Sequence, residues 1–104
     1  MESFYLIATI KPRHDKVVEA KEALRTLVAA TKAEPGCEVY DLVFGTGGFE
    51  GAGSMDAGDW LMIERWASRV AWDAHMESAH VKHLSSIQKD FLREPSQLRF
   101  YTVN

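Results

Sequence analysis

Residues 60–66 read WLMIERW, and this short stretch decides the fold. Side chains alternate between the two faces of a β-strand, so the stretch divides into two sets. One face carries Trp60, Met62, Glu64 and Trp66, and the other carries Leu61, Ile63 and Arg65. Both sets are mainly apolar, whereas a strand with one face in water usually alternates apolar and polar residues. We therefore expect a strand that belongs to a sheet covered on both faces.

Three other stretches share this two-sided apolar character. Residues 3–11 (SFYLIATIK) are rich in β-branched and aromatic residues and stop at Pro12, which cannot donate a hydrogen bond to a sheet ladder. Residues 37–44 and 98–103 are the other two. The sequence therefore predicts four strands.

Helical periodicity separates these strands. Apolar residues recur at helical spacing over residues 15–34, with Asp15 as the expected N-cap and Pro35-Gly36 as the stop. After the strand at 60–66, Ser68 is expected to cap a helix that carries His75.

The second helical segment is predicted to be broken. Residues 77–78 mark the expected break, and a further helix is expected over 79–92, with Pro95 ending it. The residues that share its apolar face are His80, Leu84, Ile87 and Phe91.

The resulting order is βαββαβ in one domain spanning residues 1–104. This order predicts an α+β, ferredoxin-like fold with a four-stranded antiparallel sheet and helices on one face. The other sheet face would expose a large apolar patch, so we expect a homodimer formed through that face. Residues 45–58 hold six of the seven glycines and are expected to form a loop, either a plain connector or a lid over a pocket.

Composition excludes several functional classes. The net charge is −3 and the Lys and Arg residues are dispersed, so a nucleic-acid partner is not expected. No stretch reaches the ~20 apolar residues that span a bilayer, so no membrane partner is expected either. The single Cys37 suits the reducing cytoplasm. The glycine-rich stretch GTGGFEG does not lead into a helix or a P-loop lysine, so no nucleotide cofactor is expected.

Several motifs together resemble the antibiotic biosynthesis monooxygenase superfamily. They are Ala8-Thr9-Ile10, the turn Glu34-Pro35-Gly36-Cys37 with Tyr40 after it, Glu64-Arg65-Trp66, and the run HMESAH that contains His75, Ser78 and His80. The resemblance implies a dimeric ferredoxin-like α+β barrel. It also implies a cofactor-independent monooxygenase that acts on a small aromatic quinol or phenol in a cavity between sheet and helices. Anthrone-oxidising and haem-degrading members depend on an asparagine near the cavity, and the only asparagine here is Asn104, so those two activities are not expected.

Two other functions stay open at this point. The same cavity could serve a non-catalytic or regulatory module that binds a small aromatic ligand. An isomerase of a small phosphorylated carbonyl compound would need cationic groups at the cavity mouth, and Arg65 and Arg99 are candidates.

Three titratable residues are the candidate catalytic groups. His75 is the expected base, because an imidazole exchanges protons near neutral pH, and His80 is a candidate for the same reason. Glu64 interrupts an apolar strand face, so it must find a partner or accept a raised pKa, and it could orient a histidine or serve as a base. Each residue also has a plain structural interpretation: the histidines could bond backbone carbonyls, and Glu64 could pair with an arginine, with Arg65, Arg69 and Arg99 available.

The expected substrate-binding residues are mainly aromatic. Trp66, Tyr40 and Phe91 would form the walls, with Leu84 beside them. No metal site is predicted, because His75, His80 and His83 are spaced by five and three residues and match no zinc framework.

Overall fold

The computed structural model describes residues 2–46 and 59–103. Apart from Gly45 and Thr46, the predicted loop over 45–58 lies outside these residues. The elements follow the predicted βαββαβ order, with the second helical segment divided. They are β1 (Phe4–Ile10), α1 (Val17–Lys32), β2 (Cys37–Phe44), β3 (Trp60–Trp66), α2 (Arg69–Met76), α3 (Ala79–Ile87), the short 3-10 helix η1 (Gln88–Asp90) and β4 (Leu98–Thr102).

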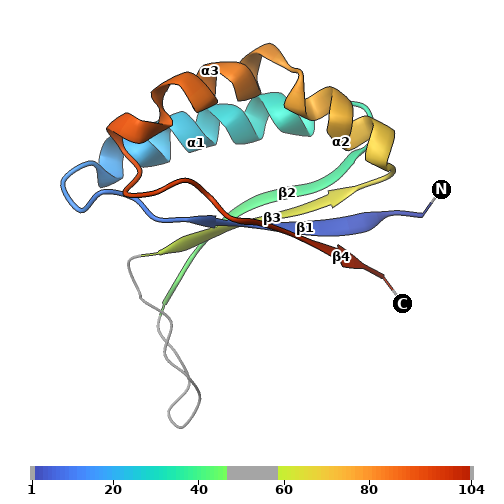
Figure 1. The fold of residues 1–104 in the computed structure, drawn as a ribbon, viewed down its shortest axis with the longest axis horizontal. Coiled ribbons are helices and arrows are strands. Elements are labelled where there is room, and N and C mark those ends of the chain that lie inside the picture. The colour runs from blue at the N-terminus through green and yellow to red at the C-terminus, as the bar shows by residue number, and fades with distance from the viewer. Residues whose placement is uncertain (1, 47–58, 104) are drawn as a thin grey trace, which may run out of the picture.

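The four strands form one antiparallel sheet in the order β2-β3-β1-β4. β1 and β3 are central, with Leu6 opposite Glu64 and Ile7 opposite Ile63. Figure 1 shows α1, α2 and α3 together on one side of the sheet. This arrangement confirms the predicted α+β, ferredoxin-like fold.

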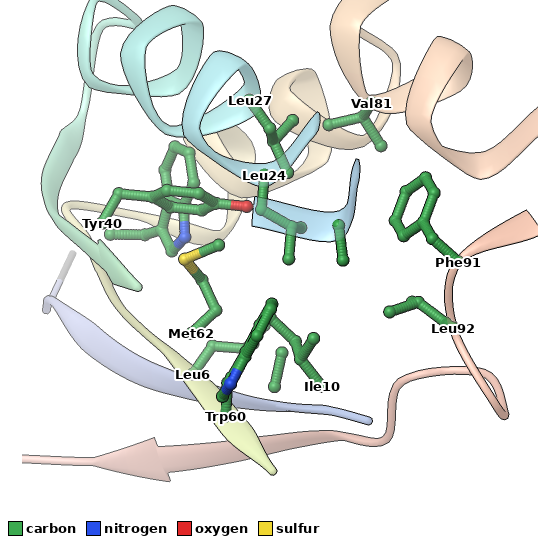
Figure 2. Close-up of a cluster of buried hydrophobic side chains, with 13 residues drawn as sticks. Leu6, Ile10, Leu24, Leu27, Tyr40, Trp60, Met62, Val81, Phe91 and Leu92 are labelled. Carbon is green, nitrogen blue, oxygen red and sulfur yellow. The ribbon is translucent and has the colours of Figure 1, made fainter. Parts of the chain in front are cut away.

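The hydrophobic core lies between the sheet and the helices. Leu24 and Leu27 of α1 point toward the sheet, where Met62 and Leu6 point back at them (Figure 2). Phe91 lies at the opposite end of this cluster from Tyr40 (Figure 2). The strand face that carries Glu64 is therefore the face that the helices cover.

Two details of the helices differ from the sequence prediction. The N-cap of α1 is Lys16, without a side-chain hydrogen bond, so the expected cap by Asp15 is wrong. The Lys16 N–H already bonds the Arg13 carbonyl at 2.9 Å, which puts Asp15 in the preceding turn. The predicted helix over 79–92 ends at Ile87, and Phe91 follows η1.

The turn after α1 brings two helices close together. Gly36 has φ +83°, a conformation that L side chains rarely adopt, and its carbonyl accepts a hydrogen bond from the Ala67 N–H at 2.8 Å. A Cβ at position 36 would lie 2.6 Å from the Cβ of Ala71 in α2. Glycine at this position therefore allows the end of α1, with Glu34, to approach α2.

Candidate active site

A cavity of about 210 Å³ lies between the sheet and the helices. Its walls are mainly aliphatic, with polar groups at a few places. The residues that matter below are Tyr40, Met62, Glu64, Trp72, His75 and Leu84. The cavity is a mostly apolar hollow with a carboxyl group, a phenol and an imidazole on its walls, which is the usual composition of a small-molecule site.

His75 is held by a carboxylate from another helix. It lies in the last turn of α2, and its Nδ1 is 2.7 Å from Oε2 of Glu34, just beyond α1. An ionised carboxylate only accepts hydrogen bonds, so Nδ1 carries the proton and donates it. In the neutral ring this leaves Nε2 with a free lone pair.

The same carboxylate oxygen also binds His80. Nε2 of His80, in the first turn of α3, lies 2.7 Å from Oε2 of Glu34. The break between α2 and α3 makes this possible: the Ser78 side chain accepts from the Val81 N–H and donates to the His75 carbonyl. Glu34 therefore bridges two histidines that belong to different helices.

Trp66 supports the site from behind. Its Nε1–H donates to Oε1 of Glu64 at 3.0 Å, and its ring centroid lies 4.7 Å from that of His75. The Tyr40 ring packs edge-on against His75, with centroids 5.5 Å apart. These contacts restrict the rotation of both titratable groups.

Burial changes the protonation of the two groups in ways that suit proton transfer. It raises the pKa of Glu64 to about 7; the Trp66 hydrogen bond opposes this rise and the charge of Glu34 adds to it. Burial lowers the pKa of His75, against the opposing effect of Glu34. His75 is therefore neutral at pH 7, while Glu64 exchanges a proton near that pH.

The structure brings together some of the predicted site residues and separates others. His75, Glu64, Tyr40 and Leu84 line the cavity. Three predicted site residues do not line it. Trp66 is fully buried behind the cavity, and Phe91 lies in the hydrophobic core. His80 faces a second hollow between α1 and α3.

The expected arginine partner of Glu64 is not found among the described residues, because Trp66 occupies that role. Arg65 points from the opposite sheet face and binds Glu38 and the Tyr5 hydroxyl. The alternative interpretation of His75 also fails, since its ring bonds a carboxylate and not a backbone carbonyl.

Two residues of the site were missed from the sequence. From the sequence, Glu34 is predicted only to be part of a turn, and Trp72 is not predicted to belong to the site. A signal for Glu34 existed: a carboxylate at a helix C-terminus is disfavoured by the helix dipole, so its presence there suggests a cationic or N–H partner elsewhere.

Comparison with known proteins supplies the family. A family model described as "Antibiotic biosynthesis monooxygenase" matches residues 3–85, which include the cavity residues from β1 to Ser85 and the Glu34–His75–His80 cluster. The chain belongs to the antibiotic biosynthesis monooxygenase family. The resemblance seen in the sequence is thereby confirmed.

Relatives in this family cover most of the chain. "Putative monooxygenase Rv0793" of Mycobacterium tuberculosis is 32% identical over 86% of this chain and 80% of its own length. "Putative monooxygenase YcnE" of Bacillus subtilis is 31% identical over 86% of both chains. The solved structure of Rv0793 superposes with a TM-score of 0.85 at 26% identity, covering 99% of this chain and 96% of its own. The crystal structure of PA3566 from Pseudomonas aeruginosa superposes with a TM-score of 0.84 at 26% identity, covering 100% of this chain and 96% of its own. These relationships support a monooxygenase-like function.

Replacing Glu64 with glutamine should change how stability depends on pH. The folded protein keeps a proton on Glu64 up to a pKa of about 7, whereas the unfolded chain releases it near 4.5. The stability that this tighter proton binding gives the folded protein is fully present below pH 4.5 and is lost as pH rises through 7. Between about pH 5 and 7.5 the wild-type free energy of unfolding should fall relative to Glu64→Gln, by on the order of 1–3 kcal/mol.

Urea unfolding of both proteins across this range measures the difference directly. The lowered pKa of His75 has the opposite effect on stability, but it is common to both proteins and cancels. Parallel profiles for the two proteins would contradict the raised pKa of Glu64.

Proposed function

We propose that this protein is a cofactor-independent monooxygenase whose substrate is a small phenol or quinol. The observation that carries the proposal is the Glu34–His75 pair. Because Nδ1 of His75 donates to Glu34, the free lone pair is on Nε2, and His75 lines the cavity while Glu34 does not. His75 is the base that removes the phenolic proton.

The dimensions and polarity of the cavity support a small aromatic substrate. Its volume of about 210 Å³ is below the ~300–1,000 Å³ of drug-sized sites, so it suits one or two fused rings. Tyr40, Met62 and Trp72 offer flat or polarisable surfaces to such a ring. Leu84 adds an aliphatic wall from α3.

The reaction balances without an external reductant. Removing the phenolic proton gives an electron-rich anion, which transfers an electron to dioxygen. One oxygen atom enters the ring and the other leaves as water, so one quinol and one dioxygen give one hydroxyquinone and one water. The substrate supplies all four electrons, and no cofactor is required for this balance.

Glu64 is the proposed acid that transfers the second proton. Its carboxyl group lines the same cavity and has a pKa of about 7, so both protonation states are populated at neutral pH. It donates a proton to the oxygen atom that leaves as water. His75 and Glu64 thus divide the proton transfers between base and acid.

Replacing His75 with alanine should reduce turnover at least a hundredfold, because a positioned general base contributes about 10²–10⁴ in rate. Oxygen uptake with a panel of hydroquinones and naphthoquinols, corrected for autoxidation without protein, measures this loss. The variant should still bind the aromatic substrate. Quenching of tryptophan fluorescence measures this binding, since Trp72 lines the cavity. His83→Ala is the matched control, because His83 is exposed on α3, and it should keep the wild-type rate.

Glu34→Gln separates positioning from packing. It keeps the shape of the side chain but removes the charge that raises the pKa of His75. We expect kcat to fall more than KM rises, and the acidic limb of the rate profile to move to lower pH. Unchanged oxygen uptake in His75→Ala would refute the assignment of the base.

The alternative of a non-catalytic binding module makes a different prediction in the same experiment. The wild-type protein would then show saturable fluorescence quenching without oxygen uptake. The isomerase alternative has no support in the structure: among the described residues no Lys or Arg lines the cavity, and Arg99 lies at a separate hollow on the other sheet face.

The homodimer is also a proposal, and the helix-free face of the sheet supports it (Figure 1). Ile7 and Ile63 pair at the centre of this face, and Tyr101 of β4, which lies opposite Tyr5 on the same face, is exposed in the single chain. A second copy packed there would cover these apolar groups.

Light scattering coupled to size exclusion should give a dimer for the wild type and a monomer for Ile63→Asp, because a carboxylate would be buried at the interface centre. Circular dichroism checks that the variant stays folded. A wild-type monomer at micromolar concentration would contradict the dimer.

The expectations on partners and location remain predictions. No helix in the described parts of the chain is long and apolar enough to cross a membrane. The cytoplasm stays the expected compartment on the strength of the single Cys37.

A further inference from the structure

Three possible metal-ligand atoms meet where the three helices come together. They are Oε2 of Glu34 beyond the end of α1, Nδ1 of His75 at the end of α2 and Nε2 of His80 at the start of α3, all within 4.8 Å of one another. His83 is not part of this group. The fold thus builds a three-residue set that the sequence spacing of the histidines did not predict.

We propose that Glu34, His75 and His80 form a binding site for a divalent transition-metal ion such as Zn²⁺, and that the bound ion inhibits the enzyme. The inhibition rests on the function proposed above, whereas the binding does not. Two imidazole nitrogens and one carboxylate oxygen are ligands that Zn²⁺ accepts readily, and they leave a further position for water.

The geometry requires only a small rearrangement. Both nitrogens lie 2.7 Å from Oε2. Two ligand atoms bound tetrahedrally at ~2.0–2.2 Å from the same zinc ion would be somewhat farther apart from each other than this. His80 is the group that can adjust, because its side chain is 26% exposed, against 14% for Glu34 and 4% for His75. It also lines the hollow between α1 and α3, which gives an ion a route from solvent that avoids the substrate cavity.

Metal binding would change the tautomer of His75. In the metal-free site Nδ1 carries the proton and Nε2 holds the lone pair. A metal ion on Nδ1 needs that lone pair, so the ring proton must move to Nε2. The neutral ring keeps one proton throughout, and only its position changes. The nitrogen that serves as the base then has no lone pair to accept the substrate's proton.

Calorimetric titration of the substrate-free protein with Zn²⁺ alone tests the binding. We expect one ion per chain in the wild type. His80→Gln keeps an N–H donor for Glu34 but loses the imidazole ligand, and should bind at least tenfold more weakly. His83→Gln, which changes a neighbouring histidine outside the cluster, should bind as the wild type does.

Co²⁺ provides a second readout, because its visible spectrum reports the coordination number. A four-coordinate spectrum in the wild type and in His83→Gln, absent in His80→Gln, supports the site. Equal Zn²⁺ affinity in the wild type and His80→Gln, or no binding in the wild type, would overturn it.

Inhibition is measured separately, so the two proposals can fail independently. Zn²⁺ at saturating concentration should stop oxygen uptake by the wild type and by His83→Gln, and EDTA should restore it. Zn²⁺ binding without any oxygen uptake in the metal-free protein would support the metal site and refute the monooxygenase. Oxygen uptake that saturating Zn²⁺ leaves unchanged would refute the inhibitory role.

Discussion

The Glu34 carboxylate joins three helices through a single oxygen atom, and the arrangement of the site depends on it. Oε2 accepts from Nδ1 of His75 and from Nε2 of His80, each at 2.7 Å. Charge-assisted hydrogen bonds of this length are among the stronger polar contacts in proteins. Two local features make them possible: the positive φ of Gly36 brings Glu34 toward α2, and the break before Ser78 turns His80 back toward the same oxygen. Removing the carboxylate would leave the buried imidazole of His75 and the partly buried imidazole of His80 without their common acceptor.

Two titratable residues, His75 and Glu64, line the same apolar cavity, and their pKa values are shifted in opposite directions. Burial favours the neutral form of both, so it raises the pKa of Glu64 and lowers that of His75. Trp66 contacts both residues from behind the cavity wall, through its N–H and its ring. An aromatic residue that does not line the cavity thus helps set the chemistry inside it.

The fold was largely predictable from the sequence, and the site only in part. The two-sided apolar strands and the stop at Pro35-Gly36 are local patterns, and they predicted the order of elements and the ferredoxin-like class correctly. The partner of His75 is not local: Glu34 lies 41 residues away, and only the close approach of the turn after α1 to α2 brings them together. Trp66 and Phe91 were predicted to be cavity walls, but neither lines the cavity. Strand alternation and helix periodicity show which residues face inward, but not which inward residues border a space.

The central claim is that Glu34 fixes the tautomer of His75 and leaves Nε2 free toward the cavity. Nitrogen-15 NMR of the histidine rings in metal-free protein near pH 7.5 tests this most directly, with the His75 signals assigned by comparison with His75→Ala. The account predicts that His75 is neutral, with its proton on Nδ1 and an unprotonated Nε2. A His75 ring that carries its proton on Nε2 would contradict it.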